Sequence, residues 1–230
     1  MKKLRAGLAH FQDVVYPKHR DLFERLASNQ TPLAVFIACS DSRVLPNLIV
    51  QAEPGELFLI RNAGNIIPPE GSAYGGTTAA LEYAIVALGL RNVILCGHSG
   101  CGAMTGVLRP ETLDAMPAVR QWVSYADPAR RAAEVENPGA AFDELLEAVV
   151  GHNVICQLAN LRTFPFVSPL LDSGQLELHG WVYDIATGHV KGLDAAGKTF
   201  VPLGADTQPV SGERRGLSAL GDGEEFWRRL

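Results

Sequence analysis

Short apolar runs alternate with longer amphipathic segments along the chain. Residues 35–37 and 93–95 are apolar at every position, which is typical of strands buried on both faces of a parallel sheet. A third short run lies at residues 57–60, and residues 176–183 alternate between apolar and polar side chains, which predicts a strand with two different faces. Strands that alternate with helical segments predict an α/β fold with a central, mostly parallel β-sheet flanked by helices.

Helical periodicity accounts for much of the remaining chain. Apolar residues recur at helical spacing between residues 4 and 27, with an interruption predicted at Pro17. A glycine-rich loop at residues 71–76 opens another helix, and Gly89 provides its C-terminal stop. The further predicted segments cover residues 44–50 (a short helix or turn), 77–88, 111–137 (one or two short helices) and 142–161, the last ending near Pro165.

These elements predict one domain over residues 1–204, in which residues 1–28 form an N-terminal helical arm. The arm precedes the first predicted strand, and no strand lies within it on which its helices could pack. Its apolar positions therefore pack either on its own domain or on a partner subunit, and the pattern does not decide between them. Residues 205–230 include many Gly, Asp and Glu residues, and we assign them to a separate C-terminal tail.

Composition and charge exclude several classes of function. The chain has 230 residues, of which 47% are hydrophobic and 20% charged, as expected of a globular domain with a sizeable core. A formal net charge of -5 and scattered basic residues give no support for a nucleic-acid partner. No apolar stretch has the length of a membrane span or of a signal-peptide core, so we expect a cytoplasmic protein that acts on a small solute.

Potential metal ligands follow two of the predicted buried strands. Cys39 closes the first strand, and His98 and Cys101 follow the second. The carboxyl ends of parallel strands meet at one edge of a sheet, so these side chains are expected to converge. Two thiolates and one imidazole suit Zn(II), and a set of three protein ligands leaves a fourth position for water or substrate. On these residues alone, two buried apolar cysteines and a hydrogen-bonded turn histidine are an equally good interpretation.

A charged pair beside Cys39 favours the metal interpretation. Asp41 lies two residues after Cys39, and Arg43 two residues after that, on the turn that leaves the strand. A carboxylate at this place can either occupy the open metal position or accept a hydrogen bond from water, and a guanidinium that holds it bidentately selects between the two. Two further cysteines, Cys96 in a strand and Cys156 in a helix, are interpreted as buried thiols, which fits a reducing compartment.

Three spaced motifs carry a resemblance to a known family. They are the segments Cys39–Arg43, Pro54–Phe58 continuing through Arg61–Asn65, and Gly97–Gly102. In this order they are similar to the motifs of the β-class carbonic anhydrases. The resemblance is specific from about Gln30 to Met104 and weaker to about Asp184.

This resemblance implies the reversible hydration of carbon dioxide to bicarbonate and a proton, with one Zn(II) per chain. It assigns Cys39, His98 and Cys101 to the metal, Asp41 to the hydrogen bond that orients the hydroxide, and Arg43 to keeping Asp41 off the metal. Zinc lowers the pKa of its bound water from about 15.7 to roughly 7, so that hydroxide is available to attack carbon dioxide at neutral pH.

The resemblance also implies a substrate pocket shared between subunits of a homodimer or a dimer-based higher oligomer. In the family, the N-terminal arm packs on the partner. The pocket residues are Gln30, Phe58 and Tyr83 from the neighbouring subunit, with Ala63 and Gly102 from the zinc-bearing one. Phe36 stands where the self-regulating subgroup has Trp, and together with Gln30 it favours the plant-like subgroup with an open, constitutively active site.

Three other functions stay open at this point. The segment Gly97–Gly100 is similar to part of an α/β-hydrolase nucleophile elbow, but the fifth position is Cys101 rather than Gly. A carbon disulfide or carbonyl sulfide hydrolase on the same scaffold shares the zinc chemistry. A catalytically silent zinc-containing scaffold protein is the third, and the Asp41–Arg43 pair argues against it because a purely structural site needs no open position.

Overall fold

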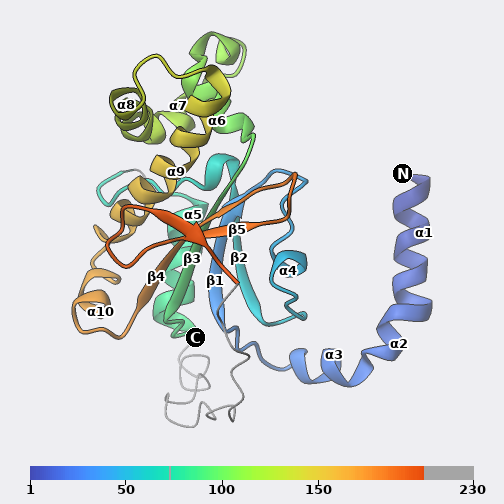
Figure 1. Cartoon of the computed structure of the whole chain (residues 1–230). Helices are drawn as coiled ribbons and strands as arrows, with labels where there is room; N and C mark the ends of the chain where they lie inside the picture. The colour runs from blue at the N-terminus through green and yellow to red at the C-terminus, as the bar shows by residue number, and fades with distance from the viewer. Residues whose placement is uncertain (73, 205–230) are drawn as a thin grey trace.

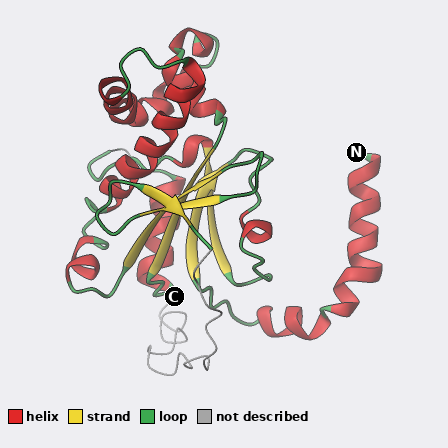
Figure 2. Cartoon of the chain, viewed as in Figure 1, coloured by secondary structure: helices red, strands yellow, loops and turns green. Residues whose placement is uncertain are grey.

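The computed structural model describes residues 1–72 and 74–204. Its centre is a six-stranded sheet in the order β2-β1-β3-β4-β5-β6 (Figures 1 and 2). The first four strands in this order run parallel, and β5 and β6 are added in antiparallel fashion. The predicted α/β fold with a mostly parallel sheet is confirmed. The strands are β1 (Ala34–Cys39), β2 (Leu57–Asn62), β3 (Asn92–His98), β4 (Glu177–Tyr183), β5 (Val190–Leu193) and β6 (Phe200–Pro202).

Helices flank the sheet and form most of its connections. Residues 77–88 fold as α5 followed by a π-helical turn. Residues 111–137 contain two short α-helices, as predicted, with one 3₁₀ turn before the first helix and another joining the two. The α-helices are α1 (Lys2–His10), α2 (Tyr16–Lys18), α3 (Arg20–Leu26), α4 (Pro46–Ile49), α5 (Gly76–Glu82), α6 (Gly102–Leu108), α7 (Pro117–Val123), α8 (Asp127–Glu136), α9 (Phe142–Leu161) and α10 (Ser168–Asp172). Across the described ranges, no helix combines the length and the apolar character needed to cross a membrane.

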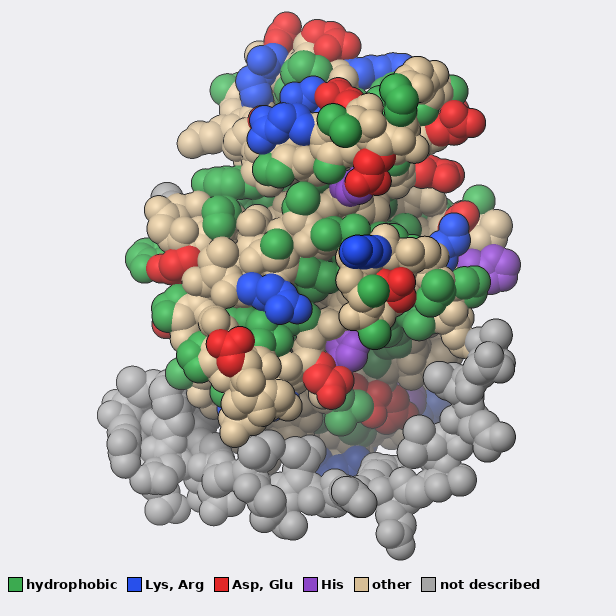
Figure 3. Space-filling view, turned by 60° about the vertical axis from the view of Figure 1, so that its left-hand side comes forward, with side chains coloured by type: hydrophobic (Ala, Val, Ile, Leu, Met, Phe, Trp, Pro, Cys, Tyr) green, Lys and Arg blue, Asp and Glu red, His purple; other side chains and the backbone are tan. Residues whose placement is uncertain are grey.

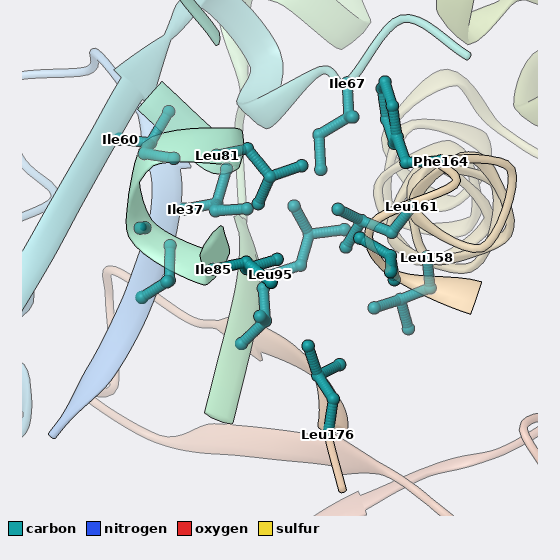
Figure 4. Close-up of a cluster of buried hydrophobic side chains, with 14 of the residues drawn as sticks. Ile37, Ile60, Ile67, Leu81, Ile85, Leu95, Leu158, Leu161, Phe164 and Leu176 are labelled. Carbon is teal, nitrogen blue, oxygen red and sulfur yellow. The ribbon is translucent and has the colours of Figure 1, made fainter. Parts of the chain in front are cut away.

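The largest hydrophobic cluster lies between the sheet and the helices α5 and α9. Ile37 of β1 and Leu95 of β3 are fully buried in it. Figure 4 shows how side chains from both layers meet there. The helical side contributes Leu81, Ile85, Leu158 and Leu161, and Phe164 lies beyond the end of α9. This packing fixes the sheet against α9 and therefore fixes the strand ends that carry the candidate ligands.

The opposite face of β1 is buried as well. Phe36 and Ala38 alternate with Ile37 along the strand and belong to a separate cluster with Cys96. The Phe36 ring meets Trp181 of β4 edge-on, with ring centroids 5.8 Å apart. Because both faces are covered, the uninterrupted apolar run of β1 is explained, and the prediction of a doubly buried strand is confirmed for it.

The N-terminal arm stands apart from the rest of the chain (Figure 1). None of the residues in its helices or in the π turn between them is buried. Leu4 and Leu8 of α1 are 67% and 58% exposed, although their spacing places them on one helical face. At the other end of the arm, the side chain of Leu26 lies close to Gly55. The apolar face of α1 is thus left without cover by its own domain.

The break in the arm falls at His19, two residues after the interruption predicted at Pro17. Helical backbone continues through Pro17 to Lys18, and the chain changes direction at His19 (φ -113°, ψ 18°). The π turn Phe11–Val15 ends with the N–H of Tyr16 donating to the carbonyl of Phe11, five residues earlier. Pro17 therefore falls in the first turn of a new segment, where a missing N–H is tolerated. The assigned tail, residues 205–230, lies outside the described residues.

Candidate metal centre

The three candidate ligands converge because their strands are neighbours. Cys39 and His98 are the last residues of β1 and β3, which pair in parallel with Ala38 opposite Cys96. Cys101 follows a tight turn and immediately precedes α6. The two Sγ atoms and a ring nitrogen of His98 all lie within 4.8 Å of one another, and all three residues are buried. The predicted convergence is confirmed.

The imidazole of His98 is oriented for metal binding. Its Nδ1 lies 3.0 Å from the carbonyl oxygen of Ser99. A carbonyl can only accept, so Nδ1 carries the proton and Nε2 presents a lone pair. Nε2 is buried and has no hydrogen-bond partner. A buried polar atom without a partner is rare in folded proteins, and a metal ion at this place would satisfy it.

The two thiols form a strongly interacting pair. A hydrogen bond from Cys101, with a further one from the N–H of Gly64, lowers the pKa of Cys39 to about 4. The same hydrogen bond, together with burial, raises the pKa of Cys101 above its usual range. The shared hydrogen bond therefore favours negative charge on Cys39 and opposes it on Cys101. A divalent cation would stabilise both thiolates, so the donor set fits Zn(II).

Asp41 and Arg43 lie at the margin of this cluster. The Nε and Nη2 atoms of Arg43 donate to the two carboxylate oxygens of Asp41 at 2.9 and 2.7 Å, and the backbone N–H of Arg43 adds a third bond at 2.9 Å. Arg43 thereby holds the pKa of the Asp41 carboxyl well below its usual range. The Oδ2 atom of Asp41 is 3.9 Å from Nε2 of His98. An ionised carboxylate therefore borders the ligand cluster and is held by the guanidinium.

Arg61 is part of the site although no role was predicted for it from the sequence. Its Nη2 atom donates to the carbonyl oxygens of Cys39, Asp41 and Val44 at 2.9, 2.8 and 2.8 Å. These bonds fix the backbone of the turn that carries the carboxylate. The signal in the sequence was its motif, Arg61–Asn65, which follows a strand directly. Only the pairing of β1 with β2 shows which carbonyls the guanidinium reaches.

Two of the predicted pocket residues lie beside the ligands. Gly102 begins α6 directly after Cys101. Ala63 precedes Gly64, whose N–H donates to Sγ of Cys39 at 3.3 Å. Both positions are therefore next to residues of the ligand cluster.

The other three pocket residues are not brought to the ligands of their own chain. Phe58 and Tyr83 pack together, with ring centroids 6.2 Å apart. Phe58 pairs with Val35, four residues before Cys39 on β1, which corresponds to roughly 13 Å along a strand. Gln30 lies on the exposed segment between α3 and β1. A contribution from these side chains would have to come from another copy of the chain.

The hydrolase alternative receives no support from the structure. The hydroxyl oxygen of Ser99 accepts the backbone N–H of Ile185 at 3.0 Å, which joins the end of β3 to the turn after β4. The neighbouring His98 directs Nδ1 to a backbone carbonyl rather than to this hydroxyl. Cys96 and Cys156, predicted as buried thiols, are both free; Cys96 is buried as predicted, whereas Cys156 is only half-buried.

Comparison with known proteins agrees with this geometry. Residues 34–190 match the family model described as carbonic anhydrase. The chain is 48% identical to a carbonic anhydrase of Pseudomonas aeruginosa over 93% of its own length and 97% of that protein. Among solved structures, the β-carbonic anhydrase CcaA superposes with a TM-score of 0.85 at 46% identity, covering 88% of this chain and 98% of the other. The chain belongs to the β-class carbonic anhydrase family.

The similarity to β-class carbonic anhydrases covers more of the chain than the three sequence motifs. One of two tetrameric β-carbonic anhydrases of Sordaria macrospora is also similar, with a TM-score of 0.73 at 28% identity over 84% of this chain and 98% of that one. The family match continues to residue 190 and so includes β4 and the whole of α9. The match therefore also spans the helices α7 and α8.

Proposed function

We propose that this β-class carbonic anhydrase catalyses the reversible hydration of carbon dioxide with one Zn(II) held by Cys39, His98 and Cys101. The observation that carries the proposal is the buried ligand cluster, in which Nε2 of His98 has a lone pair and no other partner. When bound, zinc supplies a Lewis acid that lowers the pKa of water from about 15.7 to roughly 7. Three protein ligands leave room for one more, as a catalytic zinc site requires.

Asp41 orients the attacking water in this proposal. Its carboxylate is ionised at neutral pH because the Arg43 guanidinium lowers its pKa, so it can only accept hydrogen bonds. By accepting a hydrogen bond from the attacking oxygen, Asp41 would turn a lone pair of that oxygen toward carbon dioxide. Both oxygens of Asp41 are engaged by Arg43, which opposes rotation of the carboxylate onto the metal. This arrangement supports the open, constitutively active subgroup.

A second copy of the chain completes the pocket in this proposal. It supplies Gln30, Phe58 and Tyr83, which within one chain lie away from the ligands, while Ala63 and Gly102 belong to the zinc-bearing chain. Two observations support the exchange: α1 has an uncovered apolar face, and a similar β-carbonic anhydrase is tetrameric. The functional unit is thus a homodimer or a dimer-based oligomer, built by docking the arm on its partner.

The alternatives differ from this proposal in what they require. A silent scaffold needs zinc but not an ionised carboxylate beside it, and a carbon disulfide or carbonyl sulfide hydrolase needs a different substrate. The family and its relatives favour neither.

Acidic and basic side chains are interspersed over the face seen in Figure 3, which gives no support for a nucleic-acid partner there. The cytoplasmic location stays a prediction.

Replacement of Asp41 by Asn tests the assigned chemistry. Asp41→Asn keeps the size of the side chain and removes no metal ligand, so zinc content should be unchanged while carbon dioxide hydration falls by about 10- to 100-fold. The matched variant Cys39→Ala should instead lose zinc. Stopped-flow hydration and metal analysis on the same samples separate the two effects. Near-normal turnover of Asp41→Asn would refute its role.

A further inference from the structure

Helix α9 carries three amide side chains in otherwise apolar surroundings. Asn153 and Gln157 are 1% and 0% exposed, one helical turn apart, and Asn160 follows on the same face. The residues around them belong to the two main hydrophobic clusters. Burying amides is unfavourable unless each finds a partner, so their place in a core helix calls for a function that apolar residues could not perform.

The three amides hold both ends of one short loop. The Nδ2 atom of Asn153 donates to the carbonyl oxygen of Gly64 at 3.0 Å. At the other end, the Oε1 atom of Gln157 accepts the N–H of Ile67 at 2.9 Å, and Nδ2 of Asn160 donates to the carbonyl oxygen of Ile67 at 2.8 Å.

The amides also bind one another. Gln157 donates to Oδ1 of Asn153 at 3.0 Å, and Asn160 donates to Oε1 of Gln157 at 3.1 Å. We call these three side chains, Asn153, Gln157 and Asn160, the amide ladder. Since each bond restrains the next side chain, the ladder acts on the loop as a unit.

Gly64 links the ladder to a metal ligand. Its carbonyl oxygen receives the bond from Asn153, and its N–H donates to Sγ of Cys39 at 3.3 Å. One residue thus joins a buried side chain of α9 to the sulfur. From the other side, Nε1 of Trp122 donates to the carbonyl oxygen of Ala63 at 2.8 Å and limits movement of the same loop.

We propose that Asn153 and Gln157 are positioning residues, which hold Gly64 so that its N–H donates to the Cys39 sulfur and thereby set the metal affinity of the centre and the electron density on that ligand. The inference rests on the proposed function, because it concerns the same zinc site. Hydrogen bonds to metal ligands orient them and tune the metal, and their removal reduces metal affinity by about 10- to 100-fold.

The test compares Asn153→Ala with a control on the same helix. The control is Leu158→Ala, because Leu158 is also buried but lies against Gly180 of β4 instead of the loop. Zinc affinity is measured by competition with a chelator, and the Co(II)-loaded proteins are compared by their thiolate-to-cobalt charge-transfer absorption. Both variants should melt at lower temperature than the wild-type protein. Only Asn153→Ala should lose about 10- to 100-fold in zinc affinity and shift the absorption band.

A milder variant keeps the test decisive if Asn153→Ala does not fold. Asn160→Ala removes a half-buried member of the amide ladder and should shift affinity and absorption in the same direction by less. Wild-type affinity and an unmoved band in the folded variants would overturn the inference and leave the ladder a purely structural role. Failure of the wild-type protein itself to bind zinc would overturn both the proposed function and the inference, and it is recognised without any variant.

Discussion

Replacement of Gly64 by Ala perturbs the loop beside the metal ligands at its most constrained position. Gly64 has φ +79°, a region that costs other residues about 1–3 kcal/mol. A Cβ atom there would lie 2.9 Å from Cβ of Ala103 and 3.0 Å from Cε of Met104. Overpacking of this kind costs about 1–3 kcal/mol in a closed core. The two effects together predict a loss of about 2–6 kcal/mol in the free energy of unfolding.

The thermal midpoint makes this loss measurable. For a chain of this size, each kcal/mol lowers the midpoint by about 2–4 °C, so Gly64→Ala should melt roughly 4–24 °C below the wild-type protein. Gly174→Ala is the matched control, because Gly174 has φ +66° but no neighbouring atom within 4 Å of the place that a Cβ would take. Circular dichroism at equal protein and zinc concentrations gives both midpoints. Equal losses in the two variants would refute the close packing of Gly64 against α6.

Two further predictions concern the arm and a buried thiol. The full-length double variant Leu4→Asp, Leu8→Asp should weaken self-association by at least about tenfold and lower turnover, while zinc is retained. Sedimentation, stopped-flow hydration and metal analysis check these three effects. Unchanged association would contradict docking of the arm on a partner. Burial raises the pKa of Cys96 to about 12, so in the native protein at pH 8 iodoacetamide should leave Cys96 unmodified. Because this pKa lies above the unfolded value of about 8.5, the stability that depends on the neutral thiol is present below pH 8.5 and is lost as pH rises toward 12. Mass spectrometry that finds Cys96 alkylated as fast in the native as in the unfolded protein would contradict its burial.

The ligand cluster is the part of the molecule that the sequence predicts best. Cys39 and His98 end two apolar runs, and parallel strands bring such ends to one edge without any knowledge of the rest of the fold. The Asp41–Arg43 pair is equally local, because two residues on one turn need no long-range information to meet. Strands β1 to β4 and the long helix α9 follow from hydrophobic periodicity in the same way, whereas the short edge strands β5 and β6 were not predicted.

The surroundings of the cluster depend on long-range packing, which periodicity does not describe. Gly64 reaches Cys39 across 25 positions, and Asn153 reaches Gly64 across 89. The three amides at helical spacing in an apolar segment were a signal, but nothing in the sequence shows which loop they face. The arm gives a local example, since the π turn before Pro17 shifts the break to His19.

A catalytic zinc ion held by Cys39, His98 and Cys101 is the basis of the proposed function. Stopped-flow hydration of carbon dioxide by the purified protein, with zinc quantified in the same sample across about pH 6–9, tests it most directly. We expect about one zinc per chain and turnover that rises with pH through the neutral range. A full complement of zinc with no hydration at any pH would contradict a catalytic role for the centre.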